Sequence, residues 1–234
     1  MTTHRYCEPS SVQIKTLQKK VQRVQILRDC SSTRPLVWSS HIDGIQFVVK
    51  DYSFNKWAYC ASVGRFLIYR ERKALRRLWN IQGIPRFLFT LNNYAIVMEK
   101  VQGITLEEYH KRHSISPVFF DKFKKLISKI HEHGVAHCDL KRAANIIVGE
   151  GETPYIVDWS SAIFEEEFPF LLRFIYERFK LDDKLSVIKY KMRCLPELVS
   201  EEERELYMRR SLLESSIKRT RDKLRDLIKK WASR

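Results

Sequence analysis

The sequence predicts an α+β chain with two lobes, in which a strand-rich N-terminal part precedes a helix-rich C-terminal part. Short apolar runs rich in β-branched and aromatic residues dominate the first hundred positions, and longer segments of helical periodicity follow Gly103. No repeat, low-complexity tract or Pro/Gly/Ser-rich linker divides the 234 residues. We therefore expect an N-terminal lobe over 1–102 and a C-terminal helical lobe over 103–234.

The elements of the first lobe follow from turn residues and apolar spacing. The basic first thirty residues are of mixed pattern, and segment 16–27 fits either a helix or a strand. The run IQFVV at 45–49 follows an Asp-Gly turn and predicts a strand. Leucines at helical spacing predict a helix over 66–79. A hairpin about an Asn-Asn pair is expected from two short strands, 86–90 and 94–98.

The second lobe reads mainly as helices. Pro117 starts a helix whose apolar residues keep a 3.6 period as far as Ile130. A second hairpin is expected over 145–157, and helix from there to the end. The aromatic stretch 168–179 is interpreted as a core helix in preference to a membrane-surface contact. Ser200 caps a long terminal helix with an acidic first turn and a basic remainder.

The composition indicates an intracellular, globular protein. With 44% hydrophobic and 12% aromatic residues the chain can bury a core, which excludes disorder of the whole. No run approaches the roughly 18 apolar residues of a membrane span, and the first residues lack the apolar core of a secretory signal. Five scattered cysteines without a CxxC pair argue against a disulfide framework and a zinc site. We expect a cytoplasmic monomer. The alternative is a position at the inner face of the membrane.

Glycine content and charge bear on the ligand. The seven glycines form neither of the common phosphate-binding loops, G-x-G-x-x-G and G-x-x-x-x-G-K-[ST]. The net charge of +15 suggests an anionic partner: nucleic acid, a membrane surface or a phosphorylated substrate. Because the basic residues are spread over all segments and no reader motif is present, nucleic acid is the least expected of the three.

One segment carries the chemical signal. The sequence His-Cys-Asp-Leu-Lys at 137–141 is followed by Asn145 and then by Asp-Trp-Ser at 158–160. This order resembles the catalytic loop and the metal-binding D-F-G motif of the protein-kinase-like superfamily. Lys50 resembles the strand lysine of that family, and Glu71 resembles the glutamate of the helix that follows. The resemblance runs from about residue 44 to 162 and implies a two-lobed protein-kinase-like fold with a small N-lobe and a short helical C-lobe.

The resemblance also implies roles in nucleotide binding, with ATP and Mg²⁺ as cofactors. Lys50 would contact the α- and β-phosphates while Glu71 holds its side chain in an ion pair. Asp158 and Asn145 would hold Mg²⁺, which prefers oxygen ligands. The segment before Gly103 resembles the hinge that holds the adenine, at Met98, Glu99 and Val101.

The remaining implied roles concern transfer to an acceptor hydroxyl. Asp139 would orient the hydroxyl and receive its proton, and Lys141 would neutralise charge on the transferred phosphoryl group. His137 would support the loop through hydrogen bonds. The acceptor would be an anionic protein, through Ser or Thr, or a lipopolysaccharide-type sugar of a glycolipid. The alternative is a catalytically weak pseudokinase that serves as a binding scaffold.

Three departures from the family pattern bear on the mechanism. The Gly-rich loop is absent, so backbone amides around 38–40 would cover ATP. Five residues separate Asp139 from Asn145 where the family has four, which predicts a one-residue bulge. Asp158 is followed by Trp-Ser instead of Phe-Gly, and no A-P-E motif follows. These features resemble the compact atypical branch: RIO-like kinases and the bacterial Kdo and heptose kinases of the lipopolysaccharide core.

Overall fold

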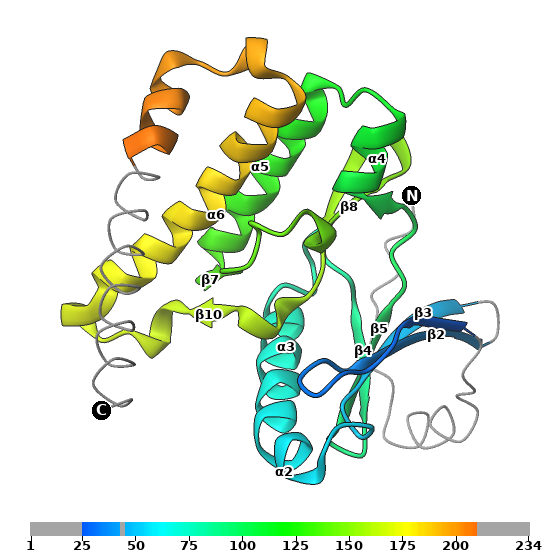
Figure 1. Ribbon diagram of the computed structural model, residues 1–234. Coiled ribbons are helices and arrows are strands. Elements are labelled where there is room, and N and C mark those ends of the chain that lie inside the picture. Colours follow the sequence, from blue (N-terminus) through cyan, green and yellow to red (C-terminus); the bar gives the residue numbers. More distant parts are fainter. Residues whose placement is uncertain (1–24, 43–44, 210–234) are drawn as a thin grey trace, which may run out of the picture.

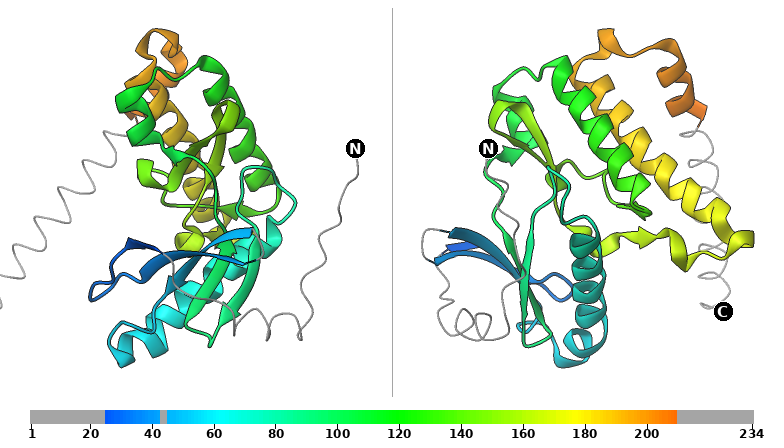
Figure 2. Two further views of the ribbon diagram at one scale, coloured as in Figure 1. Left: turned by 90° about the vertical axis from the view of Figure 1, so that its right-hand side faces the viewer. Right: turned by 180° about the vertical axis from the view of Figure 1, so that it is seen from behind.

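The computed structural model describes residues 25–42 and 45–209. Figure 1 shows a strand-rich lobe below and a helical lobe above, and the two further views in Figure 2 show the same division. The first lobe contains a five-stranded antiparallel sheet in the order β1-β2-β3-β5-β4. Its strands are β1 (Gln25–Arg28), β2 (Leu36–Ile42), β3 (Ile45–Asp51), β4 (Phe87–Leu91) and β5 (Ala95–Glu99).

A helix covers one face of this sheet. A short helix α2 (Trp57–Tyr59) and a π-helical turn over 60–64 lead into α3 (Arg65–Arg77). The inner face of α3 buries Ile68, Glu71 and Leu75, which are spaced three and four residues apart as on one side of a helix. The hairpin between β4 and β5 turns at Asn92 and Asn93, both with positive φ, as expected for a tight hairpin turn.

The second lobe is built around two long helices. Helix α5 (Pro117–Glu132) packs beside α6 (Arg173–Cys194), as Figure 1 shows. The smaller elements are β6 (Ile104–Thr105), α4 (Leu106–Arg112), β7 (Val135–Ala136), β8 (Ile146–Gly149), β9 (Thr153–Ile156) and β10 (Ile163–Phe164). A further helix spans 201–209. No helix in the described ranges is long and apolar enough to cross a bilayer.

One apolar core continues through both lobes. It joins Leu75 of α3 and Ile96 of β5 to Ile127 of α5 and Ile156 of β9. A smaller cluster that includes Trp38 and other side chains of the sheet covers the opposite sheet face. The two faces follow strand alternation, because adjacent side chains point in opposite directions. The lobes are therefore packed on each other and not merely linked.

The loop before β4 adds a second connection between the lobes. Ile156 N–H donates to the Gly83 carbonyl at 2.9 Å. Gly83 has φ +100°, and a Cβ there would lie 2.7 Å from a Leu126 methyl and from the Pro154 carbonyl oxygen. Only glycine fits this approach without movement of α5 or β9.

Several of the expected helices and strands are present with slightly different bounds, and others are replaced by different secondary structure. The structure confirms the strand at 45–49, the helix at 66–79, the helix at 117–130 and both hairpins. Segment 38–40, whose backbone amides were expected to cover ATP, lies within strand β2, and that role stays a prediction. The helix expected from 158 onward begins only at Arg173, after β10 and three short 3-10 turns. Most of segment 16–27 and the terminal helix beyond 209 lie outside the described residues.

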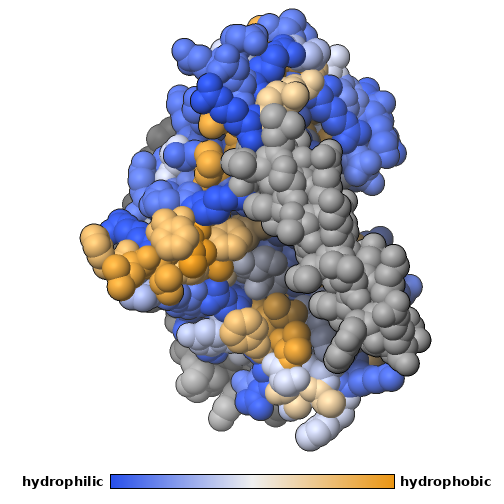
Figure 3. Space-filling model, turned by 60° about the vertical axis from the view of Figure 1, so that its left-hand side comes forward, coloured by the Kyte–Doolittle hydropathy of each residue, from blue (hydrophilic) through white to orange (hydrophobic). Residues whose placement is uncertain are grey.

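The aromatic stretch 168–179 is only partly core. Phe170, Leu171 and Phe174 are 88%, 82% and 68% exposed, whereas Tyr176 is fully buried. Apolar side chains gather at the start of α6 on the face shown in Figure 3. The expectation of a core helix was wrong for 170–174 because this segment turns away before α6 begins to pack.

The described start of the terminal helix agrees with the expected cap. The Ser200 hydroxyl accepts from Glu203 N–H at 3.2 Å, and the Glu203 carboxylate accepts from Ser200 N–H at 3.2 Å. This reciprocal pair is a capping box, which satisfies two donors at the helix start.

Candidate active site

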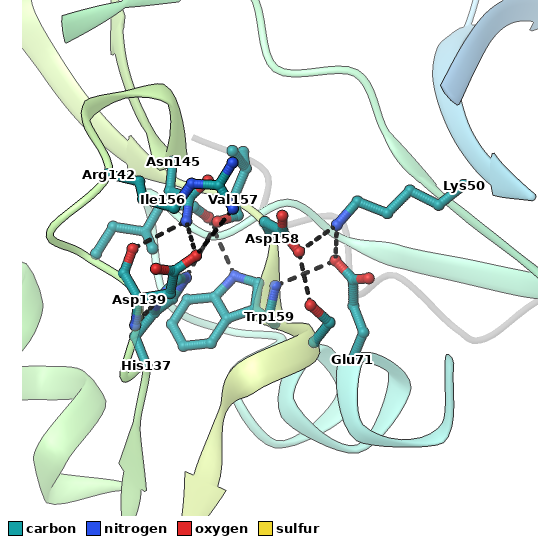
Figure 4. Close-up of polar contacts among 11 residues, drawn as sticks. Lys50, Glu71, His137, Asp139, Arg142, Asn145, Ile156, Val157, Asp158 and Trp159 are labelled. Atoms are coloured by element: carbon teal, nitrogen blue, oxygen red, sulfur yellow. Dashed lines mark hydrogen bonds and ion pairs between the residues drawn. The ribbon is translucent and has the colours of Figure 1, made fainter. Parts of the chain in front are cut away.

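Three charged residues from distant elements meet between the lobes (Figure 4). Lys50 lies on β3 next to Val49; since Val49 joins the outer cluster, alternation turns Lys50 toward α3. Its Nζ lies 2.7 Å from Glu71 Oε1 and 2.8 Å from Asp158 Oδ1. The ion pair expected between Lys50 and Glu71 is thus present, and Asp158 joins it.

The electrostatics of this group follow from burial and pairing. Burial lowers the pKa of Lys50, but the Asp158 and Glu71 carboxylates outweigh it and raise that pKa above its usual value. The Lys50 ammonium holds the pKa of Asp158 well below its usual range, against the opposing effect of burial. Burial raises the pKa of Glu71 and the neighbouring Asp158 carboxylate raises it further, against the lowering effect of the Lys50 ammonium. Lys50 and Asp158 are therefore charged at neutral pH.

The segment that carries Asp158 is held in an uncommon backbone conformation. Asp158 has φ 67° and ψ 69°, in the left-handed region. Trp159, the next residue, is fully buried; its backbone N–H donates to Glu71 at 3.2 Å and its indole N–H donates to the Ile156 carbonyl at 3.1 Å. The Ser160 hydroxyl donates to Asp158 Oδ1 at 2.8 Å. Trp159 thus anchors a turn that presents the Asp158 carboxylate.

The residues of segment 137–145, which we call the catalytic loop after the expected resemblance, form a second group beside the first. The Asn145 amide nitrogen donates to the Asp139 carbonyl at 2.9 Å and to Asp139 Oδ2 at 3.1 Å. Arg142 Nη1 lies 3.5 Å from the same carboxylate oxygen. The structure therefore brings Asn145 to Asp139 despite the additional residue, which the 3-10 turn Ala143–Asn145 accommodates.

His137 supports the loop and is fully buried. Its Nδ1 accepts from Asp139 N–H at 3.3 Å, so Nε2 carries the proton and donates to the Val157 carbonyl at 3.1 Å. Burial lowers the pKa of His137, which keeps the ring neutral. The ring also packs edge-on against Trp159. His137 thus connects the segment of Asp139 to the segment of Asp158.

Sequence reasoning missed two residues of α6 that hold the catalytic loop. The buried Asp183 carboxylate accepts from the backbone N–H groups of His137 and Cys138 at 2.7 and 3.0 Å, and from His131 Nε2 at 3.1 Å. The Tyr190 hydroxyl donates to the Lys141 carbonyl at 2.7 Å. The only signal in the sequence was their separation of seven residues, which is two turns of a helix. Surface residues of a helix show the same separation, so it does not mark these two as part of a site.

The remaining expected residues lie at the rim of this site. Met98 is buried on β5, opposite Val48. Glu99 pairs with Arg86 at 3.0 Å, and Val101 is half-buried just after β5. Lys141 is exposed in the catalytic loop. None of these residues makes a contact drawn in Figure 4.

A set of ion pairs fastens α3 to the segment after β10. Arg70, Lys73 and Arg77 share one side of α3, at spacings of three and four residues. Arg70 pairs with Glu167, and Lys73 lies 3.1 Å from Glu166 and 3.3 Å from Glu167. Arg77 contacts Glu166 at 2.6 Å. We call this set the α3 clasp; it holds the helix that carries Glu71.

The donor set fits Mg²⁺ together with a nucleotide. No group of three or more His, Cys, Asp or Glu side chains in the described residues forms a metal cage. Mg²⁺ does not need one, because it keeps several waters and binds through one or two carboxylates plus substrate phosphates. The carboxylate of Asp158 and the amide oxygen of Asn145 are of the required type, and both lie near Lys50 and Asp139 (Figure 4).

Comparison with known proteins identifies the fold. No protein-family model matches the sequence, and no curated protein matches it. Among solved structures, the chain is similar to the Rio2 kinase from Chaetomium thermophilum, with a TM-score of 0.60 and 15% identity. The similarity covers 83% of this chain and 66% of that one. The fold is protein-kinase-like. The expected two-lobed fold is confirmed, and at this identity the likeness concerns the fold alone.

Proposed function

We propose that the protein is an ATP- and Mg²⁺-dependent phosphotransferase that moves the γ-phosphate to an acceptor hydroxyl. The observation that carries the proposal is the convergence of Lys50, Glu71 and Asp158 at ion-pair distance, with Asp139 and Asn145 hydrogen-bonded beside them. Phosphoryl transfer needs positioned charge more than covalent help, and this arrangement supplies it.

The proposed roles follow from the contacts. Lys50, held by Glu71, binds the α- and β-phosphates of ATP. The Asp139 carboxylate accepts the proton of the acceptor hydroxyl while its oxygen attacks the γ-phosphorus. The bond from that phosphorus to the bridging oxygen of ADP breaks, and ADP leaves. Lys141 neutralises charge on the transferred group. Mg²⁺ held by Asp158 and Asn145 neutralises charge on the phosphate oxygens when bound.

The proposed adenine site lies at the rim of the sheet. Backbone groups from Met98 to Val101 hold the base there, with Met98 forming part of the apolar floor. The acceptor is a protein Ser or Thr, or a lipopolysaccharide-type sugar. A peripheral contact with an anionic membrane surface accords with the apolar residues exposed at 170–174.

The test compares phosphoryl transfer from labelled ATP by wild type, Asp139→Ala and Asp158→Ala, with cell-extract proteins and lipopolysaccharide core as acceptors. Each substitution should reduce transfer at least about a hundredfold, because general-base and electrostatic contributions are of that size. Asp121→Ala, which removes an exposed carboxylate of α5, is the matched control and should transfer as wild type does. Equal activity in all four proteins would refute the proposal.

The second candidate is a pseudokinase scaffold that binds nucleotide without turnover. The observation in its favour is that Asn145 and Arg142 both contact the Asp139 carboxylate and compete for its lone pairs. A scaffold would show a thermal shift with Mg-ATP and no transfer above that of Asp139→Ala. Transfer that depends on Asp139 would eliminate it.

A further inference from the structure

Basic side chains on α6 differ in whether they are neutralised. Most of them contact a carboxylate: Arg178 pairs with Asp182 at 2.6 Å, Lys180 with Glu177 at 3.0 Å, and Lys191 with Glu203 at 2.8 Å. Lys184, Lys189 and Arg193 do not: within the described residues no carboxylate lies at ion-pair distance from any of them. Lys189 and Arg193 lie one turn apart on the same side of the helix, whereas Lys184 lies on another side.

This pair lies beside the catalytic loop. Lys189 Nζ donates to the Lys141 carbonyl at 2.7 Å, next to the Tyr190 hydroxyl that bonds the same oxygen. Lys141 is two residues after Asp139 in the sequence, and Arg142 contacts the Asp139 carboxylate. The position of Lys189 is therefore fixed relative to the proposed catalytic base and not that of a freely moving surface lysine.

The charges in this region repel one another. Burial lowers the pKa of Lys189, and the positive charges of Arg193 and Lys141 lower it further. Lys189 and Arg193, two neighbouring like charges with no carboxylate of the described residues at ion-pair distance, are destabilising together and favour binding of an anion. A dianion suits the pair better than a single carboxylate, because it can meet both cations and the Arg193 guanidinium can donate two parallel hydrogen bonds.

We propose that Lys189 and Arg193 form a binding site for a phosphate group carried by the acceptor. This inference rests on the proposed function and narrows its substrate class. The acceptor is then a molecule that bears a phosphate and, a short distance away, the hydroxyl that Asp139 deprotonates. Binding the phosphate at α6 places that hydroxyl at the catalytic loop, so the same contacts supply affinity and orientation.

The test uses protein saturated with Mg-AMP-PNP, which occupies the nucleotide site. Inorganic phosphate, glucose 6-phosphate and O-phosphoserine are each titrated in. At each concentration a short pulse of acetic anhydride is applied, and the acetylation of each lysine is read by mass spectrometry. Lys189 should be protected in a saturable way. Lys184, an exposed lysine of the same helix about 140° away at 3.6 residues per turn, serves as the internal reference and should not be protected.

Variants test whether the protection of Lys189 from acetylation arises from phosphate bound at Lys189 and Arg193. Arg193→Gln should weaken it at least about tenfold, because charge-assisted hydrogen bonding is lost, whereas Arg193→Lys, which keeps the charge but not the two parallel donors, should weaken it less. Lys184→Gln should bind as wild type does. Circular dichroism checks that each variant is folded. Protection of Lys184 equal to that of Lys189, or unchanged protection in Arg193→Gln, would overturn the inference.

The three probes identify what carries the phosphate. Tighter binding of glucose 6-phosphate indicates a phosphorylated sugar, and tighter binding of O-phosphoserine indicates a phosphorylated protein segment; in both cases the dependence on Arg193 is the criterion of support. Thermal shift with Mg-AMP-PNP is measured in parallel. Its absence contradicts the proposed function, whereas a normal shift with no Arg193-dependent phosphate protection contradicts this inference alone.

Discussion

At the scale of single residues, Lys50 determines the electrostatics of the site. It is buried on β3 and compensates the charges of two carboxylates, one from α3 and one from the segment after β9. Its raised pKa means that folding gains stability from the charged ammonium at any pH below the unfolded value of about 10.4. That contribution is lost only as pH rises through the higher folded pKa.

Replacing Lys50 by Met should destabilise the protein by about 3 to 5 kcal/mol, because Glu71 would be left buried without its counter-ion. The measurement is urea unfolding at pH 7. Lys56→Met, at an exposed lysine of the same lobe, is the control and should change stability by less than about 0.5 kcal/mol. In Lys50→Met/Glu71→Gln part of the loss should be recovered, and a double variant less stable than Lys50→Met would contradict this explanation.

His137 makes stability depend on pH in the opposite sense. Its pKa is lowered by burial, so the unfolded state binds a proton at a higher pH than the folded state does. Stability should therefore fall as pH decreases below about 6.5, by at most about 1.4 kcal/mol per unit from this residue. Urea midpoints at pH 7.5 and 5.5 should separate more for wild type than for His137→Asn. Equal separations would show that His137 is not buried as the neutral ring.

Part of the site was predictable at this scale and part was not. Lys50, Glu71, Asp139, Asn145 and Asp158 were found because the chemistry requires those residue types in that order. Asp183 and Tyr190 could not be found in the same way. They act through backbone groups of the loop, for which no residue type is diagnostic, and their position depends on how α6 packs.

At the scale of elements, the α3 clasp explains how Glu71 is held toward Lys50. The same helix presents Glu71 inward and Arg70, Lys73 and Arg77 sideways, toward Glu165–Glu167. Arg70 also donates to the Ala162 carbonyl, and the Lys73 ammonium lies 3.9 Å from the centre of the Phe164 ring. These contacts hold α3 against β10.

Loss of the clasp should loosen α3. In Glu166→Gln/Glu167→Gln we expect faster amide hydrogen exchange over 65–77 and a weaker response of that exchange to salt, because partly exposed ion pairs are screened. Glu197→Gln/Glu202→Gln, which changes two exposed glutamates outside the clasp, is the matched control. Exchange in α3 that is the same in both double variants would show that apolar packing alone positions the helix.

Elements were predictable where the local pattern is strong. Helix α5 has an unbroken apolar period and a proline at its first turn, and the β4–β5 hairpin has its Asn-Asn turn. Strand β2 was missed because two serines interrupt its apolar residues; pairing with β3 over the whole of Leu36–Ile42 determines its structure. The start of α6 was misplaced because apolar residues at 170–174 resemble a helix face although they are exposed.

At the scale of the whole molecule, the site takes residues from both lobes. Lys50 and Glu71 belong to the sheet and α3, whereas Asp139, Asn145 and Asp158 belong to the helical part. A nucleotide that contacts residues of both lobes would stabilise the packing of one lobe on the other as well as each lobe. The lobe boundary expected at 102/103 stays a prediction, since one core passes through both parts.

Mg-ATP should therefore raise the unfolding midpoint of the entire chain in a single transition. At a concentration of about 100 times Kd the gain is about 2.7 kcal/mol. The measurement is differential scanning calorimetry with and without Mg-ATP, and Lys50→Met should reduce the shift. Two separate transitions, of which only one responds, would indicate that the lobes unfold independently.

The contact at Gly83 limits how the lobes can move. A body attached to another at one point can swing in any direction, but a body attached at two points can turn only about the line that joins them. The chain crosses between the lobes near Gly103, and the Gly83 carbonyl is bonded to Ile156 of β9. Once the side-chain contacts between the lobes release, the relative motion left to them is a rotation about an axis through these two places, and a bulkier side chain at position 83 would shift that axis.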